Sequence, residues 1–296
     1  MLVGSLVLAA AAAGCNAFSS VMQRRANRGD QARGRFGPGL VAHVVAQPAW
    51  LVGFLAMVAS FLLQATALST GTLAAVEPVL VLELPLTLIL AAWLLRHRMH
   101  RWDWISAAAM ALGLAVFIAA LAPAAGRTAQ VPGRLAGLAT AATVGWVAIA
   151  AAVARYGPDR SRAALFGVAA GSGFGLTASL IKIAVSRLSR DGIAAMFTTW
   201  ETYGFVVCGA ASVVLVQAAL HAGTLVAAQP GITLLDPVVS VLWGTLLLHE
   251  TIRTGPILAL AGLGCALIVT AVVVLARSSA STDEHRNDPQ PADSHG

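Results

Sequence analysis

The sequence predicts an all-α integral membrane protein with about nine transmembrane helices that form an inverted repeat. Of its 296 residues, 58% are hydrophobic and 11% are charged, whereas a soluble domain carries about 25% charged residues. Apolar runs of about 20 residues recur along the chain, and each is long enough to cross the hydrocarbon core as a helix. One segment occurs twice, once in each half.

The apolar runs place the nine helices at roughly 2–22, 49–68, 72–95, 103–121, 135–154, 163–186, 194–220, 224–248 and 256–276. Residues 1–277 are expected to form one transmembrane domain, with a first repeat over about 1–121 and a second over about 135–276. The tail, 278–296, is rich in Ser, Asp, Pro and His, and we expect it to be disordered in the cytoplasm. The segment 36–48 is too short and too rich in Gly and Pro to span, and is expected to lie along the interface.

The arginines predict the orientation. Eighteen of the nineteen basic residues are Arg, and they lie mainly between the apolar runs. With the N-terminus outside and the C-terminus inside, thirteen arginines lie on the cytoplasmic side and five outside, as the positive-inside rule favours. The charge therefore orients loops and indicates no nucleic-acid partner. The expected location is the plasma membrane, as a multi-pass protein of a bacterial inner membrane.

The doubled segment covers residues 67–101 and 219–253, which align without a gap at an offset of 152. Pro78 falls on Pro230, and Pro85 falls on Pro237. In the expected topology the first copy crosses from outside to inside and the second crosses in the opposite direction. Apolar helices interrupted by proline at corresponding places of two inverted halves are typical of secondary transporters. We therefore predict that the four prolines act as hinges.

Seven polar residues within the spans are the candidates for binding a substrate or a coupling ion. An ionisable group near the centre of a membrane helix costs at least about 2.5–3.5 kcal/mol, so each one needs a partner or a function. The candidates are Asp236, Glu83, Lys182, Glu77, Glu201, Gln229 and Asn16.

Lys182, Glu77 and Glu201 share the outer third of the membrane by their distance from the ends of their helices. Lys182 can pair with Glu201 or with Glu77, and the sequence does not decide between them. Two other interpretations stay open for Lys182, a side chain that reaches the outer surface and a buried pair that serves packing. Glu201 lies in the aromatic stretch Trp200–Tyr203, where an interfacial role is an equal alternative.

Asp236 and Glu83 lie about twelve residues into their helices and hence near the midplane. Gln229 precedes Asp236 by seven residues, which places both on nearly one helix face. Pro237 has no N–H and leaves the carbonyl of Thr233 without its helical donor. A lone carboxylate here either takes a proton or neutralises a cation. We therefore predict that Asp236 titrates during transport or neutralises a cationic substrate.

A stripe of small residues marks one face of the sixth expected helix, 163–186. Gly167, Gly171 and Gly175 follow each other at four-residue spacing, which favours close helix packing. Asn16 and Lys182 occupy matching places in the two halves and are the better candidates for lining a cavity.

The sequence has no motif typical of metal binding or catalysis. The three cysteines lie in separate spans and have no metal-ligand spacing. A phosphate-binding glycine loop, an HExxH pair and a Ser-His-Asp arrangement are all absent. We therefore expect a protein that is not an enzyme and needs no cofactor, and the sequence leaves a metal site undecided.

The second copy, ALHAGTLVAAQPGITLLDPVVSVLWGTLLLHETIR, resembles the drug/metabolite transporter (DMT) superfamily of the EamA-like kind, through Asp236, Pro237, Gly244 and Glu250. The first copy departs from it, with Arg98 where Glu250 falls in the second. The nine-helix plan is similar to the NIPA-type magnesium transporters, in the basic loop after the first helix and in the stretch SGFGLTASLIKIAVSRL. The resemblance implies a DMT-type bundle with one central cavity and alternating access.

The function that we expect is secondary active transport of a small polar metabolite or cation, driven by a gradient. The alternatives are a Mg²⁺ transporter of NIPA type and a membrane scaffold or accessory subunit that transports nothing. The expected partners are membrane lipid and a small-molecule or ion substrate. The sequence leaves open whether the chain acts alone or as a homodimer.

Overall fold

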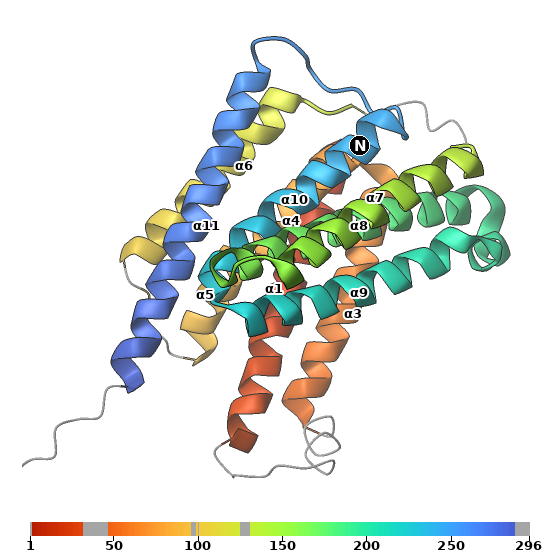
Figure 1. The fold of residues 1–296 in the computed structure, drawn as a ribbon. Helices are drawn as coiled ribbons and strands as arrows, with labels where there is room; N and C mark the ends of the chain where they lie inside the picture. The colour runs from red at the N-terminus through yellow and green to blue at the C-terminus, as the bar shows by residue number, and fades with distance from the viewer. Residues whose placement is uncertain (1, 32–46, 96–98, 100, 125–130, 288–296) are drawn as a thin grey trace, which may run out of the picture.

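The computed structural model describes residues 2–31, 47–95, 99, 101–124 and 131–287, and these residues are helical apart from short connections and one isolated β-bridge between Ala124 and Thr251 (Figure 1). The helices are α1 (Leu2–Gln31), α3 (Pro48–Thr70), α4 (Leu73–Leu80), α5 (Glu83–Leu95), α6 (Arg101–Leu121), α7 (Gly133–Tyr156), α8 (Asp159–Thr198), α9 (Trp200–Ala222), α10 (Leu225–Leu246) and α11 (Leu258–Asn287).

Eight described segments are long and apolar enough to cross a membrane, so the predicted class of a multi-pass helical membrane protein is confirmed. They lie in α1, α3, α6, α7, α8, α9 and α11, and in α4 and α5 taken together as Leu73–Leu94. The ninth expected span corresponds to α10, whose run of apolar residues is interrupted by Gln229, Pro230, Asp236 and Pro237.

The two copies of the doubled segment differ in their backbone. In the first copy the helix breaks at Val81 and Leu82, between α4 and α5. Pro85 has no N–H, so the carbonyl of Val81 accepts a 3.2 Å hydrogen bond from the N–H of Leu84 instead. In the second copy α10 runs through both Pro230 and Pro237 as one helix. The backbone is thus broken in the first copy and continuous in the second, and the role of the four prolines as hinges stays a prediction.

Two helix boundaries also differ from the prediction. α8 is bounded at Thr198, but its backbone is not helical at Gly192 (φ +83°, ψ 177°), a conformation that suits glycine. A short helical segment, 193–198, therefore follows this kink, and α9 begins only at Trp200. α11 continues to Asn287, so residues 278–287, which we expected to be disordered, are helical. Residues 288–296 of the expected tail and residues 36–46 of the expected interfacial segment lie outside the described residues.

α8 is the central helix of the bundle. Two thirds of its most apolar window is buried, against 11% for both α7 and α9. It packs along α9, α10 and α7, and α1 packs along α3. α6 and α11 form a separate pair at one side of the molecule (Figure 1).

The glycine stripe of α8 packs against α10, as the spacing predicts. A Cβ atom at Gly167 would lie 2.3 Å from the carbonyl oxygen of Ala228, and one at Gly171 would lie 2.6 Å from that of Ile232. One at Gly175 would lie 2.6 Å from the carbonyl oxygen of Asp236. Because three successive turns of α8 touch the backbone of α10, only glycine fits there, and this contact extends along the part of α10 that contains its prolines.

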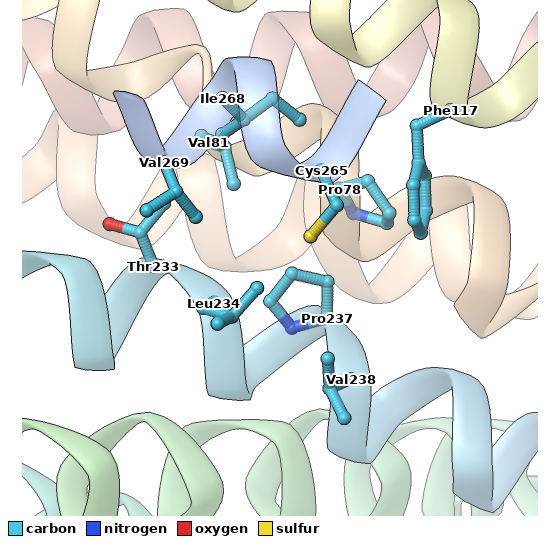
Figure 2. Close-up of a pocket in the computed structure, with 10 residues that line it drawn as sticks. All are labelled: Pro78, Val81, Phe117, Thr233, Leu234, Pro237, Val238, Cys265, Ile268 and Val269. Atoms are coloured by element: carbon cyan, nitrogen blue, oxygen red, sulfur yellow. The ribbon is translucent and has the colours of Figure 1, made fainter. Parts of the chain in front are cut away.

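The prolines of the two copies meet at the core of the bundle. Figure 2 shows Pro78 of α4, Pro237 of α10 and Cys265 of α11 around one small cavity of about 30 Å³. Its lining is apolar except for Thr233, and the space is about that of one water molecule. The broken helix α4–α5 and the unbroken helix α10 therefore contact each other where their prolines lie.

The α6–α11 pair is held by a reciprocal glycine contact. A Cβ atom at Gly113 would lie 2.8 Å from the carbonyl oxygen of Gly264, and one at Gly264 would lie 2.7 Å from that of Gly113. The end of α6 lies near the start of α11, because the N–H of Arg253 donates to the carbonyl of Leu121 at 2.9 Å. The two helices are therefore antiparallel, and each glycine occupies the same place relative to its partner.

We predict that Gly113→Ala and Gly264→Ala each lower the free energy of unfolding by about 1–3 kcal/mol, because a methyl group overpacks the crossing. Gly262→Ala is the matched control on α11, because a Cβ atom there meets nothing within 4 Å. Thermal unfolding of the purified protein in detergent measures all three variants. Equal transition temperatures for Gly264→Ala and Gly262→Ala would show that the crossing tolerates a methyl group.

Candidate functional site: a polar cavity and a buried ion pair

A cavity of about 530 Å³ lies among α1, α3, α4, α5, α8, α9 and α10. Both copies of the doubled segment contribute to its wall. Its polar lining residues are Asn16, Gln64, Glu77, Glu83, Thr177, Gln229, Thr233 and Asp236. Five of the seven candidate residues predicted from the sequence therefore face one cavity, and Lys182 and Glu201 do not line it.

Two of the three carboxylates in the cavity receive a hydrogen bond from an amide. Asn16 Nδ2 donates to Glu83 Oε2 at 2.6 Å, which links α1 to α5. Gln64 Nε2 donates to Glu77 Oε1 at 3.3 Å, which links α3 to α4. The donors are neutral amides, so these bonds orient the carboxylates without neutralising them.

Asp236 differs from the other two carboxylates. Its Oδ1 is buried and receives no hydrogen bond from the described part of the chain. Glu77, itself only 2% exposed, lines the same cavity, so a second buried negative charge faces the same space. Gln229 does not help, because its Nε2 is directed to Thr233 Oγ1 at 3.4 Å. A buried carboxylate with an unpaired oxygen attracts a proton or a cation.

Lys182 has a partner that the sequence analysis did not consider. Lys182 Nζ lies 3.1 Å from Glu250 Oε1, and the two side chains are 6% and 2% exposed. Nζ also donates a hydrogen bond to the backbone carbonyl of Gly71, at the end of α3. Neither alternative that the sequence left open, Glu201 or Glu77, forms the ion pair.

Glu250 is also the anion at the start of α4. Its Oε1 accepts from the N–H of Leu73 at 2.8 Å, and its Oε2 accepts from the N–H of Ala74 at 3.2 Å. The side chain of Thr72 accepts from the N–H of Ala75 at 3.2 Å. Three of the N–H groups at the start of α4 are thereby satisfied, and the carboxylate lies at the positive end of the helix dipole.

Glycine makes room for this carboxylate. A Cβ atom at Gly244, near the end of α10, would lie 2.4 Å from Glu250 Oε2. The pair of Lys182 and Glu250, with Gly71 and the start of α4, is called the α4 latch below. It joins the α3–α4 turn of the first copy to α8 and to the segment after α10. Ile181 and Glu77, which lie next to the latch in α8 and α4, line the cavity, so the α4 latch lies beside the cavity.

Glu201 lies in the first turn of α9, away from the cavity wall. Its Oε1 is 3.8 Å from Arg187 Nη2 of α8, and its Oε2 is buried and has no hydrogen-bond partner in the described chain. The prediction that Glu201 binds substrate has no support from this position.

The described residues of the cavity do not form a compact metal-binding site. Among the described residues no three His, Cys, Asp or Glu side chains are grouped closely enough to coordinate one. The three carboxylates of the cavity are therefore spread over its wall. The arrangement can neutralise a positive charge on a molecule larger than a single ion.

These features define a multi-pass helical membrane protein with a polar cavity inside its bundle. The chain is 30% identical over 240 residues to the uncharacterized protein Cgl0250/cg0304 of Corynebacterium glutamicum, an alignment that covers 79% of this chain and 81% of the relative. The chain therefore belongs to the same family as that protein. No protein-family model matches the chain. No solved structure matches it.

We predict that Lys182→Met and Glu250→Gln each destabilise the protein and that the double variant loses less than the sum of the two. Either change alone leaves the other group buried without its ionic partner, which costs about 3–5 kcal/mol when the pair is fully buried. A double-mutant cycle on the unfolding free energy should give a coupling of about 0.5–3 kcal/mol.

The pair of Arg187 and Glu201 is the control for this cycle. Its separation is 3.8 Å and the Arg187 side chain is 34% exposed, so its coupling should be smaller. Additive effects at Lys182 and Glu250 would contradict an energetic role for the α4 latch.

Proposed function

We propose that this protein is a secondary active transporter that moves a small polar metabolite or cation across the plasma membrane by alternating access. The observation that carries the proposal is the cavity of about 530 Å³, with three carboxylates on its wall, inside a bundle of membrane-spanning helices. A cavity of this size suits a small molecule. Ionisable groups within membrane spans are expensive, and their usual role is in a substrate or ion path.

The inverted repeat belongs to this proposal. Its supports are the doubled segment, the extensive contacts of α1 with α3 and of α8 with α9, and the reciprocal contact of Gly113 and Gly264 in the antiparallel α6–α11 pair. Such an arrangement of two halves around a central cavity is the common plan of secondary transporters. With the resemblance of the second copy, it favours a bundle of the DMT type, EamA-like.

We propose the orientation with the N-terminus outside and the C-terminus inside, in the inner membrane of a bacterium. The arginine distribution supports it, with thirteen on the cytoplasmic side and five outside. In this orientation the α4 latch lies at the outer end of the cavity. Because it joins the two halves, the outer end opens only when Lys182 and Glu250 separate or move together away from α4.

Two other functions fit less well. A Mg²⁺ transporter needs oxygen ligands around a compact ion, and the described residues hold no group of three metal-binding side chains. A scaffold without transport activity gains nothing from a buried carboxylate whose oxygen has no partner, because such a group only costs stability. Exchange or uptake by the purified protein in proteoliposomes distinguishes a transporter from a scaffold.

We predict that Asp236→Asn folds and inserts like the parent protein but loses gradient-driven transport. The amide keeps the shape of the side chain and removes the charge that would hold a proton or a cationic substrate. Uptake into proteoliposomes, measured over a range of pH, tests this. Transport by Asp236→Asn at the parent rate at every pH would show that Asp236 serves packing alone.

A further inference from the structure

We infer that the substrate of this cavity is an organic ammonium compound, a molecule with a protonated amine and an apolar or aromatic body. This inference rests on the proposed function, because it assumes that the molecule carried by the protein occupies the cavity of about 530 Å³. Three properties of the cavity favour this class of substrate: its charge, its free hydrogen-bonding groups and its apolar lining.

The charge of the lining selects a cation. Glu77, Glu83 and Asp236 line the cavity, and no Lys, Arg or His lines it in the part of the chain that the structure describes. The nearby Lys182 is engaged by Glu250 and by the carbonyl of Gly71. An anionic substrate would be repelled by the wall, whereas a cation is attracted to it.

The difference in hydrogen bonding among the three carboxylates indicates that the amine binds at Asp236. Glu83 and Glu77 each accept a hydrogen bond from an amide, and Asp236 Oδ1 is buried and accepts none. The wall therefore lacks a donor at Asp236, and an ammonium group supplies three. Glu77 lines the same cavity, so an ammonium group bound at Asp236 is also attracted by the charge of Glu77.

The rest of the lining selects an apolar body and not a hydrated metal ion. Phe61, Phe174 and Phe205 face the cavity from α3, α8 and α9, and the rings of Phe61 and Phe205 lie 6.0 Å apart at 33°. The aliphatic side chains of the lining extend this apolar part: Leu80, Val81, Leu84, Ala178, Ile181, Val206 and Ile232. A Mg²⁺ ion needs oxygen ligands and water, which this part of the wall does not provide. Aromatic rings bind an apolar body and also attract a cation over their faces.

Binding to the purified protein in detergent tests the inference with a set of similar molecules. The probes are 2-phenylethylamine, which is protonated at about pH 7, the neutral 2-phenylethanol, the anionic 3-phenylpropionate, n-hexylamine and MgCl₂ alone. We expect the two amines to raise the Tm with increasing concentration, because a ligand that binds only the folded protein stabilises it. The alcohol, the carboxylate and Mg²⁺ should give no comparable shift.

Variants separate binding in the cavity from an effect of the amines on detergent. Asp236→Asn should weaken binding of 2-phenylethylamine at least about tenfold, the usual effect of losing a hydrogen bond to a charged group. Asp191→Asn, at an exposed position of α8, is the matched control and should bind like the parent protein. Phe61→Leu should weaken 2-phenylethylamine more than n-hexylamine, while Phe54→Leu on the outer face of α3 should change neither.

The possible results distinguish this inference from the proposed function. Exchange of neutral or anionic compounds in proteoliposomes without exchange of amines overturns the ammonium substrate and leaves transport standing. Amines that bind at Asp236 but never cross the membrane leave the ligand class standing and overturn transport. If no amine shifts the Tm, or if Asp236→Asn binds amines as the parent does, the inference is wrong.

Discussion

The ion pair between Lys182 and Glu250 is the interaction on which the cavity end of this structure depends. A buried charge is tolerated only when its partners surround it, and here each partner comes from a different element. Glu250 accepts from the first N–H groups of α4, and Lys182 holds both Glu250 and the end of α3. Because α4 starts at this point, Glu77 lies one turn further on, in the wall of the cavity.

The two copies of the doubled segment differ in their backbone and in the carboxylates that they carry. The first copy is broken between α4 and α5 and carries Glu77 and Glu83 on the two sides of the break. The second copy is continuous, because the glycine stripe of α8 packs on its backbone, and it carries Asp236 near its middle. The broken helix and the continuous helix therefore both line the cavity. Relative motion of two such halves is what alternating access requires.

Much of this architecture could be predicted from the sequence. Hydropathy indicated the membrane class and the spans, and the cost of burying charge singled out Asn16, Glu77, Glu83, Gln229 and Asp236, which line one cavity in the structure. Their role in binding stays a prediction. The spacing of the α8 glycines indicated close packing, and the structure has it.

Other features depend on contacts that hydropathy does not encode. Glu250 lies just past an apolar run and reads as a loop residue, yet it caps a helix 177 positions away in the chain. The sequence suggests partners for Lys182 only among the acidic residues inside spans, and Glu250, its partner in the structure, lies outside them. The sequence shows the same prolines in both copies. The packing of α8 on α10, which the second copy alone has, accompanies its continuous helix.

The central claim is that the cavity opens to one side of the membrane at a time and that the α4 latch closes its outer end. A reporter cysteine at Ala178, in the cavity wall, tests it in a chain whose Cys15, Cys208 and Cys265 are replaced by serine. Membrane-impermeant maleimide is added from either face of oriented vesicles, with and without Glu250→Gln. The account predicts that labelling from the outer face is low with the latch intact and rises when Glu250→Gln weakens it. Equal labelling from the outer face in both proteins would contradict it.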